Sequence, residues 1–307
     1  MTDDEWLDRV RRIRQFSRNG KRAPHKPLLL LYSVAKVQRC EPSEVSFVDY
    51  EPEMRNLLAE FGPPQDELRT HSPFHWLQCD KLWNVATEEG IPSKPARATL
   101  LRAKAVGQLN SKFEKRLGCS SSLLYDVAEE LLIANWPESL HDAICEAVGL
   151  WLIRHEMEAA RERARSVRAT ATPAKRRRDP QFRSDVLHAY LHRCAMCGWD
   201  AKLGDRPVGL EAVHVRWWAH GGPNATQNAL CLCSIHQELF DRGALGITDD
   251  RRVVVSDQFA GSGDPVVAMV GSRRGRKLIL PQRKEHQPKS DYLSWHRTHV
   301  FRDAVPA

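Results

Sequence analysis

The chain contains no apolar run long enough to cross a lipid bilayer, which takes about 20 consecutive residues. The aliphatic cluster at residues 28–32 reads Leu-Leu-Leu-Leu-Tyr and is far too short. The first residues, Met-Thr-Asp-Asp-Glu-Trp, lack the basic and apolar segments of a signal peptide. Internal repeats are absent as well. The sequence therefore predicts a cytoplasmic protein without a membrane segment.

Cysteine spacing typical of a disulfide framework is also missing. Eight cysteines are spread over 307 residues, unlike the dense arrangement of small secreted domains. Five of them are scattered and are interpreted as small buried hydrophobic residues. These five are Cys40, Cys79, Cys119, Cys145 and Cys231. The other three cysteines belong to a motif in the second half of the chain.

Composition and length are those of an ordinary globular protein with a basic balance. At 307 residues the chain is long enough for two domains, each with its own core. Hydrophobic residues make up 42% and charged residues 28%, which excludes a disordered or membrane-embedded class. The formal net charge of +7 favours a polyanionic partner such as nucleic acid.

Residues 1–165 are predicted to form a mainly α-helical domain with one small β element. Residues 28–37 are apolar on nearly all sides, which indicates a buried central helix that starts near Pro27. Residues 70–77 are interpreted as an aromatic turn and residues 82–85 as a short strand. Further helices are predicted at residues 1–18, 51–61, 98–109, 121–133 and 137–168.

A change in composition predicts a basic linker at residues 166–179. Helical periodicity fails at residues 169–174, and the run Lys-Arg-Arg-Arg follows at residues 175–178. This run is either a solvated tether or a segment that contacts phosphates. Residues 180–307 then form the second domain, in which strands are predicted at residues 251–256 and, after a second basic turn, within residues 273–280.

Four soft metal ligands occur as two short pairs in the second domain. Cys194 and Cys197 form a C-x-x-C pair, and Cys233 and His236 form a C-x-x-H pair. Two intervening residues allow a tight turn to aim both ligands at one tetrahedral ion, so a structural zinc site is predicted. Cys231 could replace Cys233, but its C-x-x-x-x-H spacing fits the paired pattern less well.

The residues between and after these pairs resemble the HNH nuclease module. A strand-like run ends in His214, a glycine-rich loop leads to Asn228, and Asp241 follows the second ligand pair. The ending L-C-x-x-H-x-x-x-F-D-x-G is similar to the branch found in McrA-type, modification-dependent restriction enzymes. The resemblance covers roughly residues 180 to 250 and implies an α+β domain of the ββα-metal type with structural zinc.

The resemblance also implies a role for each of these residues. His214 would be the general base, because a neutral imidazole takes a proton from water near pH 7. Asn228 would hold the loop and orient His214 through its backbone or its side chain. Asp241 would ligate a catalytic divalent ion, Mg²⁺ or Mn²⁺, both of which prefer oxygen ligands.

Two positions depart from the commonest pattern of this module. Val213 stands where Asp or His often supplies a metal ligand, and Gln237 stands where a second histidine is common. Gln237, water and DNA phosphate oxygens would complete the coordination shell of the catalytic ion. Glu211 is a weaker candidate, because side chains alternate along a strand and Glu211 therefore points to the face opposite His214. A zinc knuckle without catalysis, with His214 as a core histidine, remains an alternative; His220 is interpreted as a polar loop contact.

Two patches of the first domain carry a specific order of residues. The first is Lys-Arg-Ala-Pro-His-Lys-Pro-Leu-Leu-Leu-Leu at residues 21–31. The second is Ser-Pro-Phe-His-Trp-Leu at residues 72–77, followed by Asp80 and the pair Leu-Trp at residues 82–83. Both patches resemble the sulfur-binding domain of type IV restriction enzymes, which recognises phosphorothioate-modified DNA. The resemblance covers roughly residues 5 to 155.

Replacing a non-bridging phosphate oxygen by sulfur keeps the charge, but the sulfur atom is larger, softer and less hydrated. A shallow apolar surface can therefore gain free energy by burying it.

The candidate DNA-binding residues fall into three groups. Ser72, Pro73 and Phe74 would form the apolar surface; Arg22, His25 and Lys26 would hold the phosphate; Arg97, Thr99 and Arg102 would contact bases or flanking phosphates. Family members often carry an aromatic residue where this chain has Ser72. The prolines could instead only shape a helix start, and Phe74 could be ordinary core.

These features together predict a two-domain type IV restriction endonuclease. It would bind phosphorothioate-modified double-stranded DNA and hydrolyse phosphodiester bonds near the modification. Cutting both strands needs two active sites, so a homodimer is expected. The alternatives are an HNH endonuclease that reads methylated or unmodified DNA, and a non-catalytic DNA-binding protein with a zinc staple.

Overall fold

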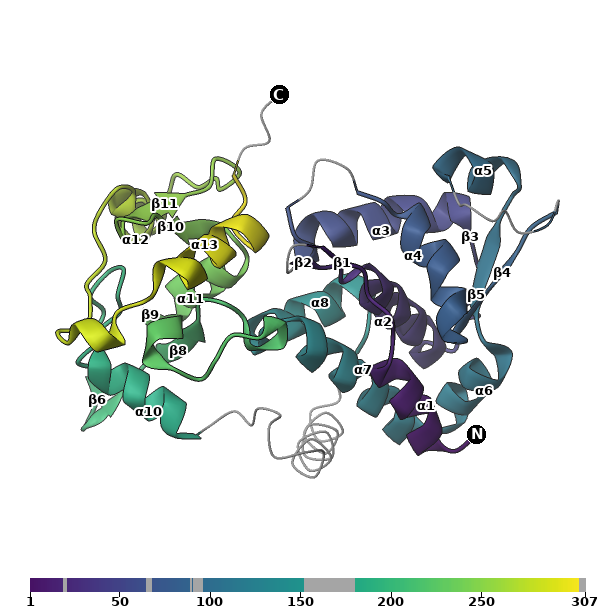
Figure 1. Cartoon of the computed structure of the whole chain (residues 1–307), viewed down its shortest axis with the longest axis horizontal. Helices are drawn as coiled ribbons and strands as arrows, with labels where there is room; N and C mark the ends of the chain where they lie inside the picture. Colours follow the sequence, from purple (N-terminus) through teal and green to yellow (C-terminus); the bar gives the residue numbers. More distant parts are fainter. Residues whose placement is uncertain (19–20, 65–67, 89, 91–95, 152–179, 304–307) are drawn as a thin grey trace. The chain divides into compact units, whose positions relative to one another are not determined.

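The computed structural model describes residues 1–18, 21–64, 68–88, 90, 96–151 and 180–303. These residues belong to two compact units, residues 1–175 and 176–307, each of which is described by itself (Figure 1). The predicted linker at residues 166–179 and most of the helix predicted at residues 137–168 lie outside the described residues. Within the described part, every helix is too short or too polar to traverse a lipid bilayer.

The first unit is built around helix α2, as the apolar run at residues 28–37 predicts. Leu28 to Leu31 and Val34 are completely buried, and α2 packs against α3, α4, α6, α7 and α8. Its helices are α1 (Asp3–Arg11), α2 (His25–Gln38), α3 (Phe47–Phe61), α4 (His71–Trp76), α5 (Arg97–Arg102), α6 (Ser111–Cys119), α7 (Ser121–Asn135) and α8 (His141–Val148). Helix α8 ends at Gly149, which takes the left-handed conformation (φ 69°) that glycine adopts without strain.

A three-stranded antiparallel sheet corrects one prediction. Strands β3 (Val45–Ser46) and β4 (Trp83–Ala86) flank β5 (Val106–Leu109), so the helix predicted at residues 98–109 covers only α5. Lys104 has a positive φ of 47°, which breaks the helix before β5. Residues 70–77, interpreted as a turn, are mostly helix α4. A small hairpin of β1 (Ser17–Arg18) and β2 (Lys21–Arg22) completes the sheet structure.

The second unit is organised on the hairpin of β8 (Leu210–His214) and β9 (Ala229–Cys233). Leu210 pairs with Cys233 and His214 pairs with Ala229, so the hairpin carries a candidate functional residue at each end. Helices α10 (Pro180–Ala189) and α11 (Ser234–Asp241) both contact this hairpin (Figure 1). This hairpin followed by a helix is the α+β arrangement that the sequence predicts.

The remaining elements of the second unit surround this centre. Two further hairpins pair β6 (Lys202–Leu203) with β7 (Arg206–Pro207), and β10 (Leu245–Ile247) with β11 (Val253–Val255). Helices α12 (Asp264–Met269) and α13 (Ser290–His299) follow. The strand predicted within residues 273–280 is reduced to a single bridge between Arg252 and Lys277. Val186, Leu210, Leu230, Phe240 and Leu245 are completely buried in the core.

Candidate metal centre and active site

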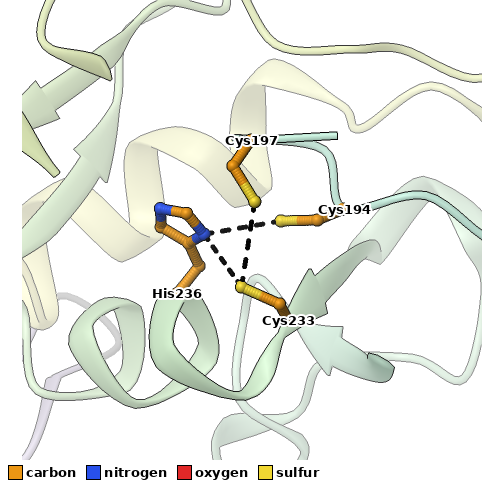
Figure 2. Close-up of side chains that lie close together, drawn as sticks. All are labelled: Cys194, Cys197, Cys233 and His236. Atoms are coloured by element: carbon orange, nitrogen blue, oxygen red, sulfur yellow. Dashed lines mark hydrogen bonds between the residues drawn. The ribbon is translucent and has the colours of Figure 1, made fainter. Parts of the chain in front are cut away.

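Four side chains of the second unit converge as a tetrahedral ion would require. Cys194 and Cys197 lie in the loop after α10, Cys233 ends β9, and His236 lies in the first turn of α11 (Figure 2). Nδ1 of His236 lies 3.5 Å from Sγ of Cys194 and 3.1 Å from Sγ of Cys233, and the sulfurs of Cys197 and Cys233 are 3.9 Å apart. Ligand atoms of a tetrahedral zinc site are roughly 3.5–3.8 Å apart, so these residues fit zinc.

The surroundings of the cluster favour metal binding. Nε2 of His236 donates to the Met269 carbonyl oxygen at 2.8 Å, which leaves Nδ1 as the ligand nitrogen facing the sulfurs. Hydrogen bonds from Cys197 and Cys233 hold the pKa of the Cys194 thiol well below its usual range, which favours the thiolate that binds a metal. Cys194, Cys233 and His236 are buried. The cluster is therefore a closed site of the structural type.

Cys231, the alternative ligand, lies outside the cluster. Its side chain is completely buried, and burial raises the pKa of its thiol to about 12. Its carbonyl oxygen accepts a hydrogen bond of 2.7 Å from the Ala195 amide, which fixes the C-x-x-C loop against β9. Cys233 is the last residue of β9 and directly precedes α11, which carries His236, whereas Cys231 lies two residues earlier within the strand. The structure thus brings Cys233, and not Cys231, to the other ligands.

His214 is held on two sides at the end of β8. The ring of Phe182, in the first turns of α10, stacks on the imidazole with a centroid distance of 4.3 Å and an interplanar angle of 15°. Nε2 of His214 donates to Oδ1 of Asn224 at 2.9 Å. An amide oxygen can only accept, so this bond places the ring proton on Nε2 and the lone pair of the neutral imidazole on Nδ1. The ring is thereby fixed in both orientation and tautomer.

Asn228 acts on the loop that carries Asn224. Its Oδ1 accepts from the Arg216 amide at 2.9 Å, and its Nδ2 donates to the carbonyl oxygens of Arg216 and Pro223 at 3.0 and 3.1 Å. A Cβ at Gly222 would lie 2.6 Å from that same Nδ2, so the loop requires glycine there. The Asn228 carbonyl oxygen also accepts from the Val215 amide at 2.9 Å, next to His214. Asn228 shapes the loop, while Asn224, which sequence reasoning missed, contacts the imidazole.

The candidate ligands of a catalytic ion lie on helix α11. Asp241 ends the helix and is 3% exposed, and Gln237 lies one turn earlier and is half-buried. Glu211 instead forms an ion pair of 3.1 Å with Arg183. Among the described residues, the cysteine–histidine cluster is the one group of three or more His, Cys, Asp or Glu side chains with ligand atoms close together. His214 and Asp241 therefore do not belong to a ready-made cluster of this kind.

A groove of about 680 Å³ opens beside His214. Phe182 and Asn224, the two residues that hold the imidazole, both belong to its lining. His188 of α10 and His286 also line it, and Nδ1 of His286 is 2.9 Å from Oγ1 of Thr226. A substrate strand in this groove would contact the two residues that hold the imidazole.

The two sequence patches of the first unit meet through an ion pair. Nζ of Lys26, at the start of α2, lies 2.6 Å from Oδ2 of Asp80, just after α4, and both side chains are largely buried. Asp80 also accepts a hydrogen bond of 3.1 Å from the Arg14 amide. Burial lowers the pKa of His25 to about 4, so its imidazole is neutral near pH 7. The charge of Lys26 is therefore already offset, and His25 contributes no positive charge.

Phe74 lies in the core, which corrects its predicted place on a contact surface. Its ring is completely buried, with centroid distances of 5.1 Å to Phe47, 4.9 Å to Tyr50 and 5.7 Å to Trp83. A ring without exposed surface cannot contact DNA itself and can only pack beneath the residues that do. Pro73, the other residue predicted for that surface, is buried as well. The residues of the same helix with accessible area are His71 and Ser72, which are half-buried, and Trp76, which is 42% exposed.

The remaining DNA-binding candidates of the first unit lie at α5 and β2. Arg97 donates to the Glu51 carboxylate through Nε and, at 2.7 Å, through Nη2; this hydrogen bonding lowers the pKa of Glu51. Thr99 is half-buried and Arg102 is exposed on α5. Arg22 lies in β2, and its side chain is outside the described part of the structure.

The second unit has the architecture and the side chains of a zinc-braced ββα nuclease domain. Residues 194–248 match the family model of the HNH endonuclease, and residues 3–152 match the family model described as ScoMcrA-like, DNA sulfur-binding domain. The second unit is therefore an HNH endonuclease domain, which makes the protein a DNA-cleaving hydrolase. Along the chain, the match to the DNA sulfur-binding domain precedes this nuclease domain.

Solved structures similar to the chain include three proteins. The sulfur-binding domain of SprMcrA, in complex with phosphorothioated DNA, is 22% identical over 49% of this chain and 95% of its own, with a TM-score of 0.44. The sulfur-binding and SRA domains of ScoMcrA, also complexed with phosphorothioated DNA, are 23% identical over 50% of each chain, with a TM-score of 0.45. The modification-dependent TagI restriction endonuclease is 31% identical over 40% of this chain and 39% of its own, with a TM-score of 0.29. Curated proteins gave no match.

Proposed function

We propose that this protein is a type IV restriction endonuclease that binds phosphorothioate-modified double-stranded DNA and hydrolyses phosphodiester bonds near the modification. The observation that carries the proposal is the presence, in one chain, of a DNA sulfur-binding domain and an HNH endonuclease domain. The sulfur-binding domain would select modified DNA for a nuclease domain that has no recognition element of its own, so that unmodified DNA is not cut. Two copies of the chain would supply one nuclease site for each strand.

The sulfur site is proposed on the face formed by α4 and the start of α2. Ser72 is the accessible part of the surface proposed to bury sulfur, with Pro73 and Phe74 buried beside it in the same helix. His25 and the Lys26–Asp80 pair shape the start of α2 rather than supply a bare positive charge. The phosphate charge would then be met by Arg22, and Arg97, Thr99 and Arg102 would contact flanking phosphates or bases.

The nuclease reaction is proposed to use His214 as the general base. Nδ1 takes the proton of a water that attacks the phosphate in line with the leaving oxygen. Asn224 keeps the proton on Nε2, and Phe182 restricts rotation of the ring. Asp241 and Gln237 would hold an Mg²⁺ or Mn²⁺ ion, which would supply positive charge to offset that on the phosphate and the leaving oxygen. Zinc in the four-residue cluster would be structural.

A binding comparison tests the recognition step. The full-length protein is titrated into two duplexes that are identical except for one sulfur in place of a non-bridging oxygen, and fluorescence anisotropy reports binding. The sulfur-containing duplex is expected to bind at least 10-fold more tightly, or by about 1.4 kcal/mol, because the apolar face favours the less hydrated atom. A methylated duplex of the same sequence is the control. Equal affinity for all three duplexes would remove sulfur recognition from the proposal.

Substitution of Asn224 tests the positioning of the imidazole. Asn224→Ala is expected to lower kcat about 10- to 100-fold, the usual effect of removing a residue that orients a reactive group, with little change in the dissociation constant for DNA. Asn224→Asp keeps the acceptor oxygen and should retain more activity. Its carboxylate stabilises the imidazolium, so the acidic limb of its pH–rate profile should move to higher pH. An Asn224→Asp variant with the activity and pH profile of Asn224→Ala would contradict the role.

A further inference from the structure

A basic turn at residues 273–277 of the nuclease unit has no role in the reaction described above. We call the segment Arg273-Arg274-Gly275-Arg276-Lys277 the basic turn. Arg274, Arg276 and Lys277 are exposed, and Arg273 is half-buried. The guanidinium of Arg252 joins them, since its Nη1 donates to the Gly275 carbonyl oxygen at 2.9 Å. Cationic side chains thus gather on one short turn.

The basic turn is held rigidly against strand β11. Amides of Gly275 and Val253 donate to the carbonyl oxygens of Val253 and Arg276 at 2.8 and 2.9 Å. The Leu278 amide donates to the Arg251 carbonyl oxygen at 2.9 Å. Gly275 has a φ of 74°, a conformation that side-chain-bearing residues rarely adopt. The turn therefore presents its cations on a fixed backbone rather than on a loose loop.

Both ends of this segment are bonded to the metal centre. Before the turn, the Met269 carbonyl oxygen accepts the hydrogen bond of 2.8 Å from Nε2 of His236. After the turn, the Ile279 amide donates to the Ala195 carbonyl oxygen, in the C-x-x-C loop, at 2.8 Å. The four-ligand cluster thus fixes the position of the basic turn as well as the hairpin and helix of the nuclease core.

Few carboxylates offset these cations. Arg274 lies 3.5 Å from Asp257, and Arg252 lies 2.7 Å from Asp250, but all four side chains are well exposed, so these pairs are weak and exchange readily with water or another anion. Arg276 and Lys277 form no ion pair with any other residue in the described ranges. A fixed array of exposed, largely uncompensated cations suits a polyphosphate.

We propose that the basic turn is a phosphate clamp by which the nuclease unit holds the backbone of duplex DNA, independently of sulfur and of base sequence. The inference rests on the proposed function only in taking DNA as the substrate, and it does not depend on sulfur recognition. Arg276 and Lys277 contact phosphates directly, and the metal centre keeps the turn in place. The clamp adds affinity and positions the strand, whereas the first unit supplies selectivity.

The salt dependence of DNA binding tests the clamp. Full-length wild type and the double variant Arg276→Ala/Lys277→Ala are titrated with sulfur-containing and plain duplexes at several salt concentrations. Loss of two phosphate contacts should reduce the slope of log K against log salt by about 1.8 and weaken both duplexes by the same factor, roughly 10-fold near physiological salt. The ratio of the two affinities should stay at its wild-type value.

A matched control removes the same charge elsewhere in the unit. Lys202→Ala/Arg206→Ala takes two exposed cations from the β6–β7 hairpin and should leave the slope unchanged. Metal content and thermal unfolding verify that the variants are folded, and Arg276→Gln/Lys277→Gln repeats the test with longer side chains. An unchanged slope in the basic-turn variants, or an equal fall in the control, would overturn the clamp. A changed affinity ratio in the basic-turn variants would likewise contradict a clamp that acts independently of sulfur. Absence of any sulfur preference in the wild type, with the slope still reduced in the basic-turn variants, would contradict sulfur recognition and leave the clamp standing.

Discussion

Replacing His214 with alanine should abolish DNA cleavage while DNA binding persists. The imidazole is fixed by the Phe182 stack and by the 2.9 Å bond to Asn224, so its lone pair on Nδ1 is presented in a set direction. Removing a general base typically costs about 10²- to 10⁴-fold in rate. The measurement is single-turnover cleavage of a labelled duplex with Mg²⁺ or Mn²⁺.

His188→Ala is the matched control for this experiment. His188 lines the groove together with Phe182 and Asn224 but is exposed on α10, where its Nδ1 contacts the Ser184 carbonyl oxygen at 2.8 Å. Its loss should leave the cleavage rate within about threefold of wild type, since a surface contact of this kind is not part of the proton transfer. Equal cleavage by wild type and His214→Ala would show that His214 is not the base. If the wild type cleaves DNA with neither Mg²⁺ nor Mn²⁺, a non-catalytic DNA-binding protein with a structural zinc site would be favoured.

Replacing Cys233 with serine should unfold the nuclease unit and leave the sulfur-binding unit folded. The cluster joins the C-x-x-C loop, β9, α11 and, through the Met269 carbonyl oxygen, the end of α12. Apparent binding energies of structural zinc, about 10–16 kcal/mol, match or exceed the total stability of a typical domain, about 5–15 kcal/mol. Thermal unfolding should lose the transition of the nuclease unit, and cleavage should disappear.

Binding of the sulfur-containing duplex by the first unit should survive this substitution at reduced affinity. Cys231→Ala is the control, because Cys231 is buried in the same strand but lies outside the cluster. It should retain one metal ion per chain and lose only about 1 kcal/mol, as expected for a small truncation in the core. Full metal content and an unchanged transition in Cys233→Ser would show that Cys233 is not a ligand. Loss of metal in Cys231→Ala would transfer that role to Cys231.

Local spacing was enough to predict the metal centre and the helical core. Two residues between ligands restrict each pair to one tight turn, so Cys194 with Cys197, and Cys233 with His236, could be assigned from the chain alone. The uniformly apolar segment of α2 likewise had to be buried, whichever helices surround it. The order of His214, Asn228 and Asp241 predicted the nuclease class for the same reason, because the ββα unit is formed by one continuous stretch of chain.

Tertiary structure decided the contacts between residues that no local pattern links. Phe182 precedes His214 by a whole strand and loop, yet its ring stacks on the imidazole because α10 packs on the β8–β9 hairpin. Phe74 has the local pattern of a contact residue but is buried, because Phe47, Tyr50 and Trp83 surround it. Residues 106–109 form the central strand because β3 and β4 pair with them on both sides. Propensity and spacing act over a few residues, whereas burial and strand pairing depend on segments far apart in the chain, which only the folded structure brings together.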